Sequence, residues 1–261
     1  MPRLTTLAAL TLAAAVALAG CGGDDSGGDG SGDVIKVGTE GTYAPFTFHD
    51  PKAGNELTGY DIEVTDAVAA KLGKRVEYSE TTFDAIFAGL ESERYDVVAN
   101  QISVNPERQA KYTFSTPYTV STGVVVTRSD DTSVTRLADI AGKTSAQSAT
   151  SNWAQTATGA GAKVEAVEGL TQAIALLKQR RVDVTVNDSL AILDYLKTSG
   201  DTGVKIAAET GDRTEQAFAF RKDSPLAAQF DTALKELAAD GTLTKISEKW
   251  FGEDVSGTTT P

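Results

Sequence analysis

The chain has 261 residues, enough for one large domain or two of ordinary size, and its hydrophobic content of 41% allows a sizeable core. The net charge of -12 argues against nucleic acid as a partner, because phosphate binding needs clustered cations. One Cys and one His exclude disulfide scaffolds and Cys/His zinc sites, and no calcium loop of the Asp-x-Asp-x-Asp-Gly type occurs. We therefore expect neither a metal nor a cofactor.

The first residues are typical of a secretion signal. An apolar run from Leu7 to Ala19 follows a positive charge and has the length of a signal-peptide core. The run ends at Cys21 in a sequence that resembles a bacterial lipobox, so residues 1–21 are expected to be a lipoprotein signal peptide with Cys21 lipidated. The alternative is an ordinary secretory signal with an incidental Cys. Residues 22–32, rich in Gly, Ser and Asp, predict a flexible linker.

The folded body is expected to begin near Asp33 with alternating strands and helices. β-Branched runs bounded by polar residues indicate strands, and apolar residues at helical spacing after a capping residue indicate helices. The order β-α-β-α-β implies a parallel sheet with right-handed crossovers. In chain order we expect a strand at 34–38, a helix capped by Asp61 and ending at Gly73, a strand at 76–78, a helix capped by Thr82, a strand at Val97-Val98 and a helix capped by Asn105.

A second α/β series follows a predicted loop at 114–118. The expected elements are strands at 123–127, 144–147, 164–167, 182–186, 204–207 and 217–220, a short helix at 137–140, and helices that open at Ser151, carry Leu170 to Leu177, follow Asp188, begin at Pro225 and span 243–251. The tail at 255–261 is polar and is expected to be disordered. Each half has strands that end in polar residues and then a capped helix, a pattern typical of two α/β lobes that face each other.

Arg108 stands out in the segment from Asp96 onward. Asn105 is a good N-cap and Pro106 suits the first helical position, which puts Arg108 in the first turn of a helix. A cation is mildly unfavourable there, so another role is expected. Ligands of open α/β sheets bind beyond the carboxyl ends of strands, where a guanidinium beside free N–H groups suits a carboxylate. Our hypothesis is that Arg108 binds a ligand carboxylate; the alternative is a solvated surface arginine.

Several motifs occur in order along the chain: Val37–Phe46, Leu57–Asp61, Pro106–Arg108, Tyr112–Tyr118, Asp240–Leu243 and Glu248–Gly252. In these motifs the chain resembles the extracytoplasmic solute-binding proteins of ABC importers that bind polar amino acids, and the resemblance extends from Val34 to Val255. The segment from Asn100 to Ser103 and the ending from Ser247 suggest the cystine-binding members.

This resemblance implies an α/β fold with two lobes, the type II periplasmic-binding-protein fold. Each lobe would be a mixed, mostly parallel sheet flanked by helices, and two strands would form the hinge. Lobe 1 is expected to comprise residues 33–121 and 217–254, and lobe 2 residues 122–216. The lobes would close on the ligand.

The resemblance also implies residue roles. Arg108 would bind the α-carboxylate of the ligand, assisted by the backbone around Gln101 and the hydroxyl of Ser103, and Asn100 would be a further ligand-binding residue. In the opposite lobe, Asp188 would bind the α-ammonium. The remaining implied ligand-binding residues are Tyr43 and Phe83, which would sandwich the side chain, Glu40 and Asp61 near the variable pocket, and Ser151 and Asn152 at a helix N-terminus.

Each assignment has a structural alternative. Asp188 and Asp61 are also good N-caps. Tyr43 can pack a loop, and Phe83 is spaced with Phe87 as a core pair. The turn before the helix at Ser151 departs from the usual sequence of the family. Three residues are therefore alternatives for the role of binding the ligand carboxylate there: Thr150, Ser151 and Asn152.

The leading hypothesis is a lipid-anchored receptor on the outer face of the bacterial cell membrane. It would bind a polar amino acid, with cystine the best candidate, as a monomer, and would deliver it to the permease of an ABC importer. One alternative is an enzyme on the same fold, a dehydratase or a cell-wall-cleaving enzyme, with Glu40 or Asp61 as the general acid or base. Another is a ligand sensor for a membrane receptor.

Overall fold

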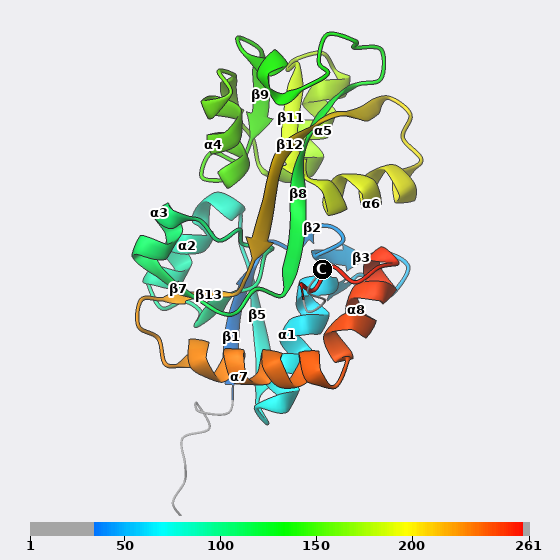
Figure 1. Cartoon of the computed structure of the whole chain (residues 1–261). Helices are drawn as coiled ribbons and strands as arrows, with labels where there is room; N and C mark the ends of the chain where they lie inside the picture. Colours follow the sequence, from blue (N-terminus) through cyan, green and yellow to red (C-terminus); the bar gives the residue numbers. More distant parts are fainter. Residues whose placement is uncertain (1–33, 258–261) are drawn as a thin grey trace, which may run out of the picture. The chain divides into compact units, whose positions relative to one another are not determined.

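The computed structural model describes residues 34–257. The predictions for the signal peptide, Cys21 and the linker lie outside these residues. Two five-stranded sheets and one three-stranded sheet are formed within the described part. We define lobe 1 as the first five-stranded sheet with the helices that pack on it and the three-stranded sheet, and lobe 2 as the second five-stranded sheet with its helices (Figure 1). The boundaries of 33–121 with 217–254 and of 122–216 stay a prediction.

Lobe 1 has a mixed sheet in the order β5-β1-β6-β13-β7, where β1 pairs in parallel with β5 and β6 and β13 is antiparallel to its neighbours. This confirms the predicted parallel arrangement of the first strands. The elements are β1 (Val34–Thr39), α1 (Tyr60–Lys71), β5 (Arg75–Glu80), α2 (Phe83–Glu91), β6 (Val97–Val98), α3 (Pro106–Lys111), β7 (Tyr112–Phe114), β13 (Ala219–Arg221), α7 (Leu226–Ala239) and α8 (Thr242–Phe251).

Lobe 2 has a mixed sheet in the order β10-β9-β11-β8-β12. Strands β10, β9 and β11 pair in parallel, and β8 is antiparallel to β11 and β12. The elements are β8 (Thr119–Arg128), the 3₁₀ helix η2 (Leu137–Ile140), β9 (Thr144–Gln147), α4 (Asn152–Gly159), β10 (Lys163–Ala166), α5 (Gly169–Lys178), β11 (Val184–Asp188), α6 (Ser189–Ser199) and β12 (Val204–Gln216).

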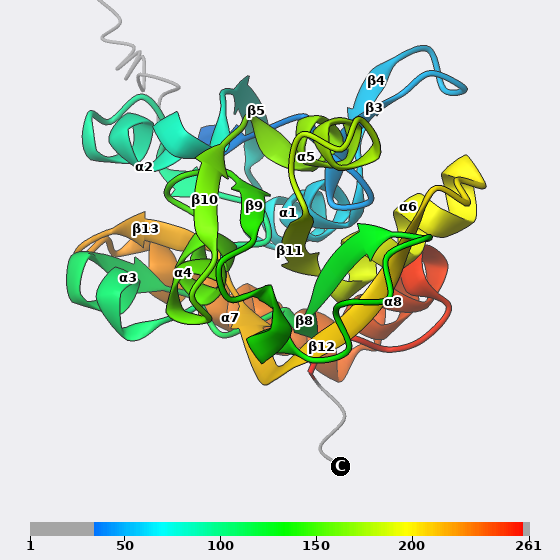
Figure 2. The same cartoon turned by 90° about the horizontal axis from the view of Figure 1, so that it is seen from above.

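Alternation along β8 explains why helices cover both faces of the lobe 2 sheet. Val124 and Val126 pack in the cluster that contains Ile174 of α5, whereas Val125 packs with Trp153 of α4. Successive side chains of a strand point to opposite faces, so an uninterrupted run of valines needs an apolar partner on each side. Figure 2 shows α4 and α5 on either side of the strands. Each fully buried side chain of this kind contributes roughly 1.5–3 kcal/mol.

Strands β8 and β12 run side by side between the two lobes (Figure 1). They pair from Arg128 with Val204 to Thr119 with Gln216, with register shifts on the way. The predicted strand at 204–207 is therefore too short. The extension is polar and irregular, a sequence pattern that does not indicate a strand, and it forms because β8 supplies a hydrogen-bonding partner.

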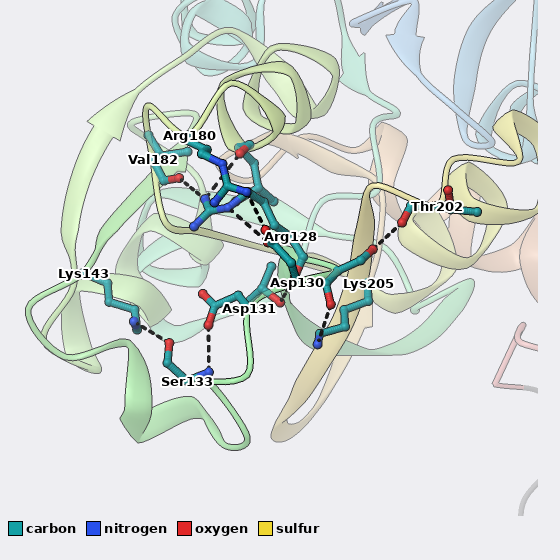
Figure 3. Close-up of polar contacts among 12 residues, drawn as sticks. Arg128, Asp130, Asp131, Ser133, Lys143, Arg180, Val182, Thr202 and Lys205 are labelled. Carbon is teal, nitrogen blue, oxygen red and sulfur yellow. Dashed lines mark hydrogen bonds and ion pairs between the residues drawn. The ribbon is translucent and has the colours of Figure 1, made fainter.

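A polar network lies at the end of β8 that is farther from lobe 1 (Figure 3). Arg128 Nη1 donates to the carbonyl oxygen of Val182 at 3.0 Å, and Asp130 forms an ion pair with Arg180. Lys205 Nζ donates to the carbonyl oxygen of Ser129 at 3.0 Å. These contacts join the end of β8 to the start of β12 and to the turn before β11. Lobe 2 is thereby tied together at the end remote from the cleft.

Three features differ from the sequence-based expectation. A small sheet of β2 (Thr42–Tyr43), β3 (Thr47–Asp50) and β4 (Glu56–Thr58) was not anticipated, and β7 extends into the predicted loop at 114–118. Val255 and Ser256, assigned from sequence to the disordered tail, are buried in the structure.

Within residues 34–257, none of the helices has the length and apolarity needed to cross a membrane.

The capping of α3 gives a direct test of the fold. Asn105 Oδ1 accepts a hydrogen bond from the N–H of Arg108 at 2.9 Å, as predicted for an N-cap. Replacing Asn105 by Ala should lower the free energy of unfolding by about 1 kcal/mol, whereas Asn105→Asp should keep the cap. Urea denaturation followed by circular dichroism measures both. Equal stability of the Ala variant and the unaltered protein would contradict this role.

Candidate ligand-binding site

A cavity lies where polar strand ends of the two lobes meet. β1 and β6 of lobe 1 and β9 and β11 of lobe 2 all end at its walls, the position at which open α/β sheets bind ligands. The cavity holds about 510 Å³ of empty space, including space open to solvent at its mouth. Its walls are Glu40, Tyr43, Phe83, Asn100, Gln101, Ala146, Gln147, Ser148, Ser151, Asn152, Trp153, Gly169, Leu170, Ala173, Thr185 and Asn187.

Seven of the predicted site residues are in this wall. Glu40, Tyr43, Phe83, Asn100 and Gln101 come from lobe 1, and Ser151 and Asn152 come from lobe 2. The other four, Asp61, Ser103, Arg108 and Asp188, are all buried but lie outside the wall. The structure thus brings residues from both lobes together as expected, with the predicted charged contacts set back from the cavity.

Glu40 and Asn100 form a fixed polar pair in the wall. Asn100 Oδ1 accepts from the Glu40 N–H at 2.8 Å, and Asn100 Nδ2 donates to Glu40 Oε2 at 2.6 Å. Burial raises the pKa of Glu40 to about 7, against the opposing effect of the Asn100 hydrogen bond. The side chain of Asn100 therefore holds the Glu40 carboxyl group in the cavity.

Arg108 is buried between aromatic rings. Its guanidinium carbon lies 5.7 Å from the ring centroid of Phe83 and 5.3 Å from that of Phe87, and the residue is 7% exposed. Its Nη1 donates to the carbonyl oxygen of Ser103 at 3.0 Å, and its Nη2 to that of Thr150 at 3.4 Å. The alternative of a solvated surface arginine is therefore wrong.

The Arg108 guanidinium forms no ion pair in the described part of the chain, although the charge of Glu107, next to it in the chain, favours its protonated form. Among residues 34–257 no carboxylate lies within ion-pair distance of the guanidinium. Burial lowers the pKa of Arg108 to about 10, so it stays a cation at neutral pH. It lines a hollow beside the main cavity together with Thr150. The hydrogen bonds that the guanidinium donates go to carbonyl oxygens of both lobes, and an anion-binding role for Arg108 stays a prediction.

Asp188 is an N-cap, as its structural alternative predicted. Its Oδ1 accepts from the Leu190 N–H at 2.9 Å, and its Oδ2 accepts from Ser121 Oγ at 2.6 Å. Burial raises the pKa of this carboxyl group to about 6. The wall residue at this point is its neighbour Asn187, whose Oδ1 accepts from the Tyr43 hydroxyl at 2.7 Å. The sequence signal for Asn187 was its place at the end of a strand, beside Asp188.

The prediction that Asp61 caps its helix is wrong. Helix α1 begins at Tyr60 with Gly59 as N-cap, and carbonyl oxygens of the preceding loop accept its first N–H groups: Pro45 from Tyr60 and Phe46 from Asp61. A Cβ at Gly59 would lie 2.1 Å from the Phe46 oxygen, so this close approach requires glycine. The Asp61 carboxylate is free to bond elsewhere, and burial raises its pKa to about 7.

In the turn before α4, Ser151 is the N-cap, since its Oγ accepts from the Ala154 N–H at 3.0 Å, and the choice of the carboxylate-binding residue in this turn stays a prediction. Thr150 instead faces lobe 1. Its N–H and hydroxyl donate to Asp84 Oδ1 at 2.9 and 2.8 Å. Asp84, in the first turn of α2, was not predicted from sequence. Together with the Tyr43–Asn187 hydrogen bond, this contact joins the lobes across the cleft.

Tyr43 and Phe83 pack as their structural alternatives predicted and also line the cavity. Tyr43 packs on Phe46 with ring centroids 5.1 Å apart and also reaches the cavity. Phe83 packs edge-on against Phe87 at 6.4 Å and also lines the cavity. Core packing therefore fixes the orientation of both wall rings.

Comparison with known proteins identifies relatives over nearly the whole body. Residues 35–253 match the family described as bacterial extracellular solute-binding proteins, family 3. The L-cystine-binding protein TcyA of Bacillus subtilis (strain 168) is 53% identical over 255 residues, which cover 93% of this chain and 94% of the relative.

Two solved structures are similar to this chain. The L-cystine solute receptor of Neisseria gonorrhoeae, in an unliganded open conformation, is 48% identical with a TM-score of 0.57, covering 85% of this chain and 94% of that one. An ancestral arginine-binding protein bound to arginine is 36% identical with a TM-score of 0.79, covering 84% and 99%. Both matches support the two-lobe fold of this chain.

The buried carboxyl groups predict how stability depends on pH. The pKa values of Glu40 and Asp61 are raised to about 7 and that of Asp188 to about 6. Between about pH 4 and pH 7 the folded protein therefore binds more protons at these groups than the unfolded chain does, so they favour folding less as the pH rises. Urea unfolding without ligand should show a smaller decline in stability from about pH 5 to about pH 7.5 for Asp61→Asn than for the unaltered protein. The same decline in both would contradict the raised pKa of Asp61.

Proposed function

Because the chain belongs to the bacterial extracellular solute-binding proteins of family 3, we propose that it binds a polar amino acid between its lobes and delivers it to an ABC importer. Cystine is our best candidate for the amino acid, supported by the cystine-binding relatives. The observation that carries the proposal is the buried Arg108 guanidinium, which has carbonyl partners but no acidic one within the described chain.

Arg108 is proposed to bind the ligand α-carboxylate. A carboxylate that leaves water must recover its hydrogen bonds, and each charge-assisted hydrogen bond contributes about 1.5–3 kcal/mol net. The hydroxyl of Ser103 and the backbone N–H groups at Ser151 and Asn152, where α4 begins, are proposed to assist. This places the carboxylate between the two lobes, so that it favours their closure.

Asp188 is proposed to bind the ligand ammonium. Its carboxylate now faces Ser121 and Gln216 Nε2, so the contact requires its side chain to turn toward the cavity behind Asn187. A bound ammonium would offset the burial that raises the Asp188 pKa to about 6. Tyr43 and Phe83 are proposed to hold the ligand side chain between them, with Glu40 in the variable part of the pocket and Asn100 holding it there.

Lipidation of Cys21 is proposed to anchor the protein to the outer face of the cell membrane, where the monomer would meet the permease. The family is extracellular, and no membrane-crossing helix is present among residues 34–257. Replacing Cys21 by Ser should leave ligand binding intact while releasing the protein from the membrane fraction.

An enzyme is the second candidate function. The observation that favours it is Glu40, a cavity carboxyl group with a pKa raised to about 7, the range that suits a general acid or base. Its fixed bond to Asn100 and the binding relatives favour a receptor instead. Incubating the protein with the amino acid that binds best and analysing the compound by mass spectrometry separates the two functions, since a receptor leaves it unchanged.

Arg108→Ala tests the proposed function. The change should abolish measurable cystine binding in titration calorimetry, since an unpaired buried carboxylate costs several kcal/mol, while the far-ultraviolet circular dichroism stays the same. Arg94→Ala, which removes an exposed arginine of the same lobe, is the matched control and should bind normally. A thermal-shift screen of all amino acids identifies the ligand first. Unchanged affinity of Arg108→Ala would show that the carboxylate is bound elsewhere.

A further inference from the structure

Asp61 is a completely buried carboxylate that takes no part in the proposed ligand contacts. It lies in the first turn of α1, behind the cavity wall. The carbonyl oxygens of Pro45 and Phe46 already accept the first N–H groups of that turn, so the carboxylate does not cap its own helix. A buried carboxylate is unfavourable unless it is hydrogen-bonded, and the bond that Asp61 does form is therefore informative.

That bond is to the backbone of a wall residue. Asp61 Oδ2 accepts from the Gln101 N–H at 2.5 Å. Gln101 has φ of 49°, in the left-handed region that side-chain-bearing residues rarely adopt. Gln101 is buried, whereas the other non-glycine residues with positive φ within residues 34–257 are all exposed. These are Asn55, Glu93, Arg180 and Asp223. Strain of this kind persists where the surroundings hold it, and it concentrates at functional sites.

The left-handed backbone directs a polar side chain to the cavity. Gln101 is 6% exposed and lines the cavity, and neither Nε2 nor Oε1 has a hydrogen-bond partner within residues 34–257. The side-chain amide of the neighbouring Asn100 is hydrogen-bonded to Glu40 and forms no hydrogen bond with the Gln101 carboxamide. A buried carboxamide without partners is unfavourable, and it can both donate and accept. It therefore suits a ligand that carries an ammonium and a carboxylate.

We propose that Asp61 is a positioning residue for ligand recognition. It holds the backbone of Gln101 in the left-handed conformation, and this directs the Gln101 carboxamide at the polar groups of a zwitterionic amino acid. The ligand touches Gln101 and never touches Asp61. The inference rests on the proposed function, because it assumes that an amino acid occupies the cavity.

A double-mutant cycle tests the coupling. The affinity for cystine is measured by titration calorimetry for the unaltered protein, Asp61→Ala, Gln101→Gly and the double variant. Gln101→Gly removes the carboxamide while glycine adopts the left-handed conformation without strain. Each single change should weaken binding roughly tenfold, the loss of one or two hydrogen bonds. In the Gln101→Gly background, Asp61→Ala should cause no further loss, since no carboxamide remains to be positioned.

Two controls separate positioning from a general effect on folding. Asp61→Asn keeps an oxygen that can accept from the Gln101 N–H and should bind within about threefold of the unaltered protein. Asp66→Ala, in the same helix, removes the bond that Asp66 Oδ1 accepts from the Tyr78 hydroxyl and should leave affinity unchanged. Circular dichroism and thermal melting show which variants fold; if Asp61→Ala does not fold, Asp61→Asn and Gln101→Gly are compared instead.

The outcomes are distinct. Equal losses from Asp61→Ala in both backgrounds, or full affinity of Gln101→Gly, would overturn the inference while the proposed function stands. Should Asp61→Ala fail to fold, a loss of binding in Asp61→Asn as large as that in Gln101→Gly would overturn it too. If the unaltered protein binds neither cystine nor any other amino acid, the proposed function fails and the inference fails with it.

Discussion

A guanidinium that is 7% exposed and forms no ion pair within the described chain places a strong demand on the surrounding structure. Arg108 is held between the rings of Phe83 and Phe87, and carbonyl oxygens of Ser103 and Thr150 accept its hydrogen bonds. These partners leave its charge uncompensated, and an anion between the lobes would compensate it. The cap of α3, the packing of α2 and the turn before α4 all bear on this one side chain.

Residues around Arg108 and the cavity also connect the two lobes. Thr150 contributes to both the Arg108 and the Asp84 contacts, and Asn187 meets Tyr43 on the other side of the cavity. A ligand that contacts both lobes shifts the population toward the closed form by its difference in affinity for the two states. The hydrogen bonds from Thr150 to Asp84 and from Tyr43 to Asn187 also stabilise the arrangement in which the lobes meet. Part of the affinity then depends on residues that the ligand does not touch.

Local patterns predicted much of the fold. Asn105-Pro106, Ser151 and Asp188 mark helix starts because capping depends on one side chain and the nearest backbone N–H groups. The predictions failed where partners distant in sequence decide the outcome. β12 continues to Gln216 because β8 lies beside it, and Asp61 does not cap because the loop carbonyls reach its helix first. The resemblance to the family predicted seven residues that lie in the cavity wall, whereas the contacts of Asp84 and Asn187 depend on the way the lobes meet.

A crystal structure of the protein grown with cystine would test the central claim most directly. The account predicts electron density for the amino acid between closed lobes, with its α-carboxylate on the guanidinium of Arg108 and the carboxamide of Gln101 within hydrogen-bond distance of the ligand. Cystine bound at another place, or bound in the cavity with its carboxylate turned away from Arg108, would contradict it.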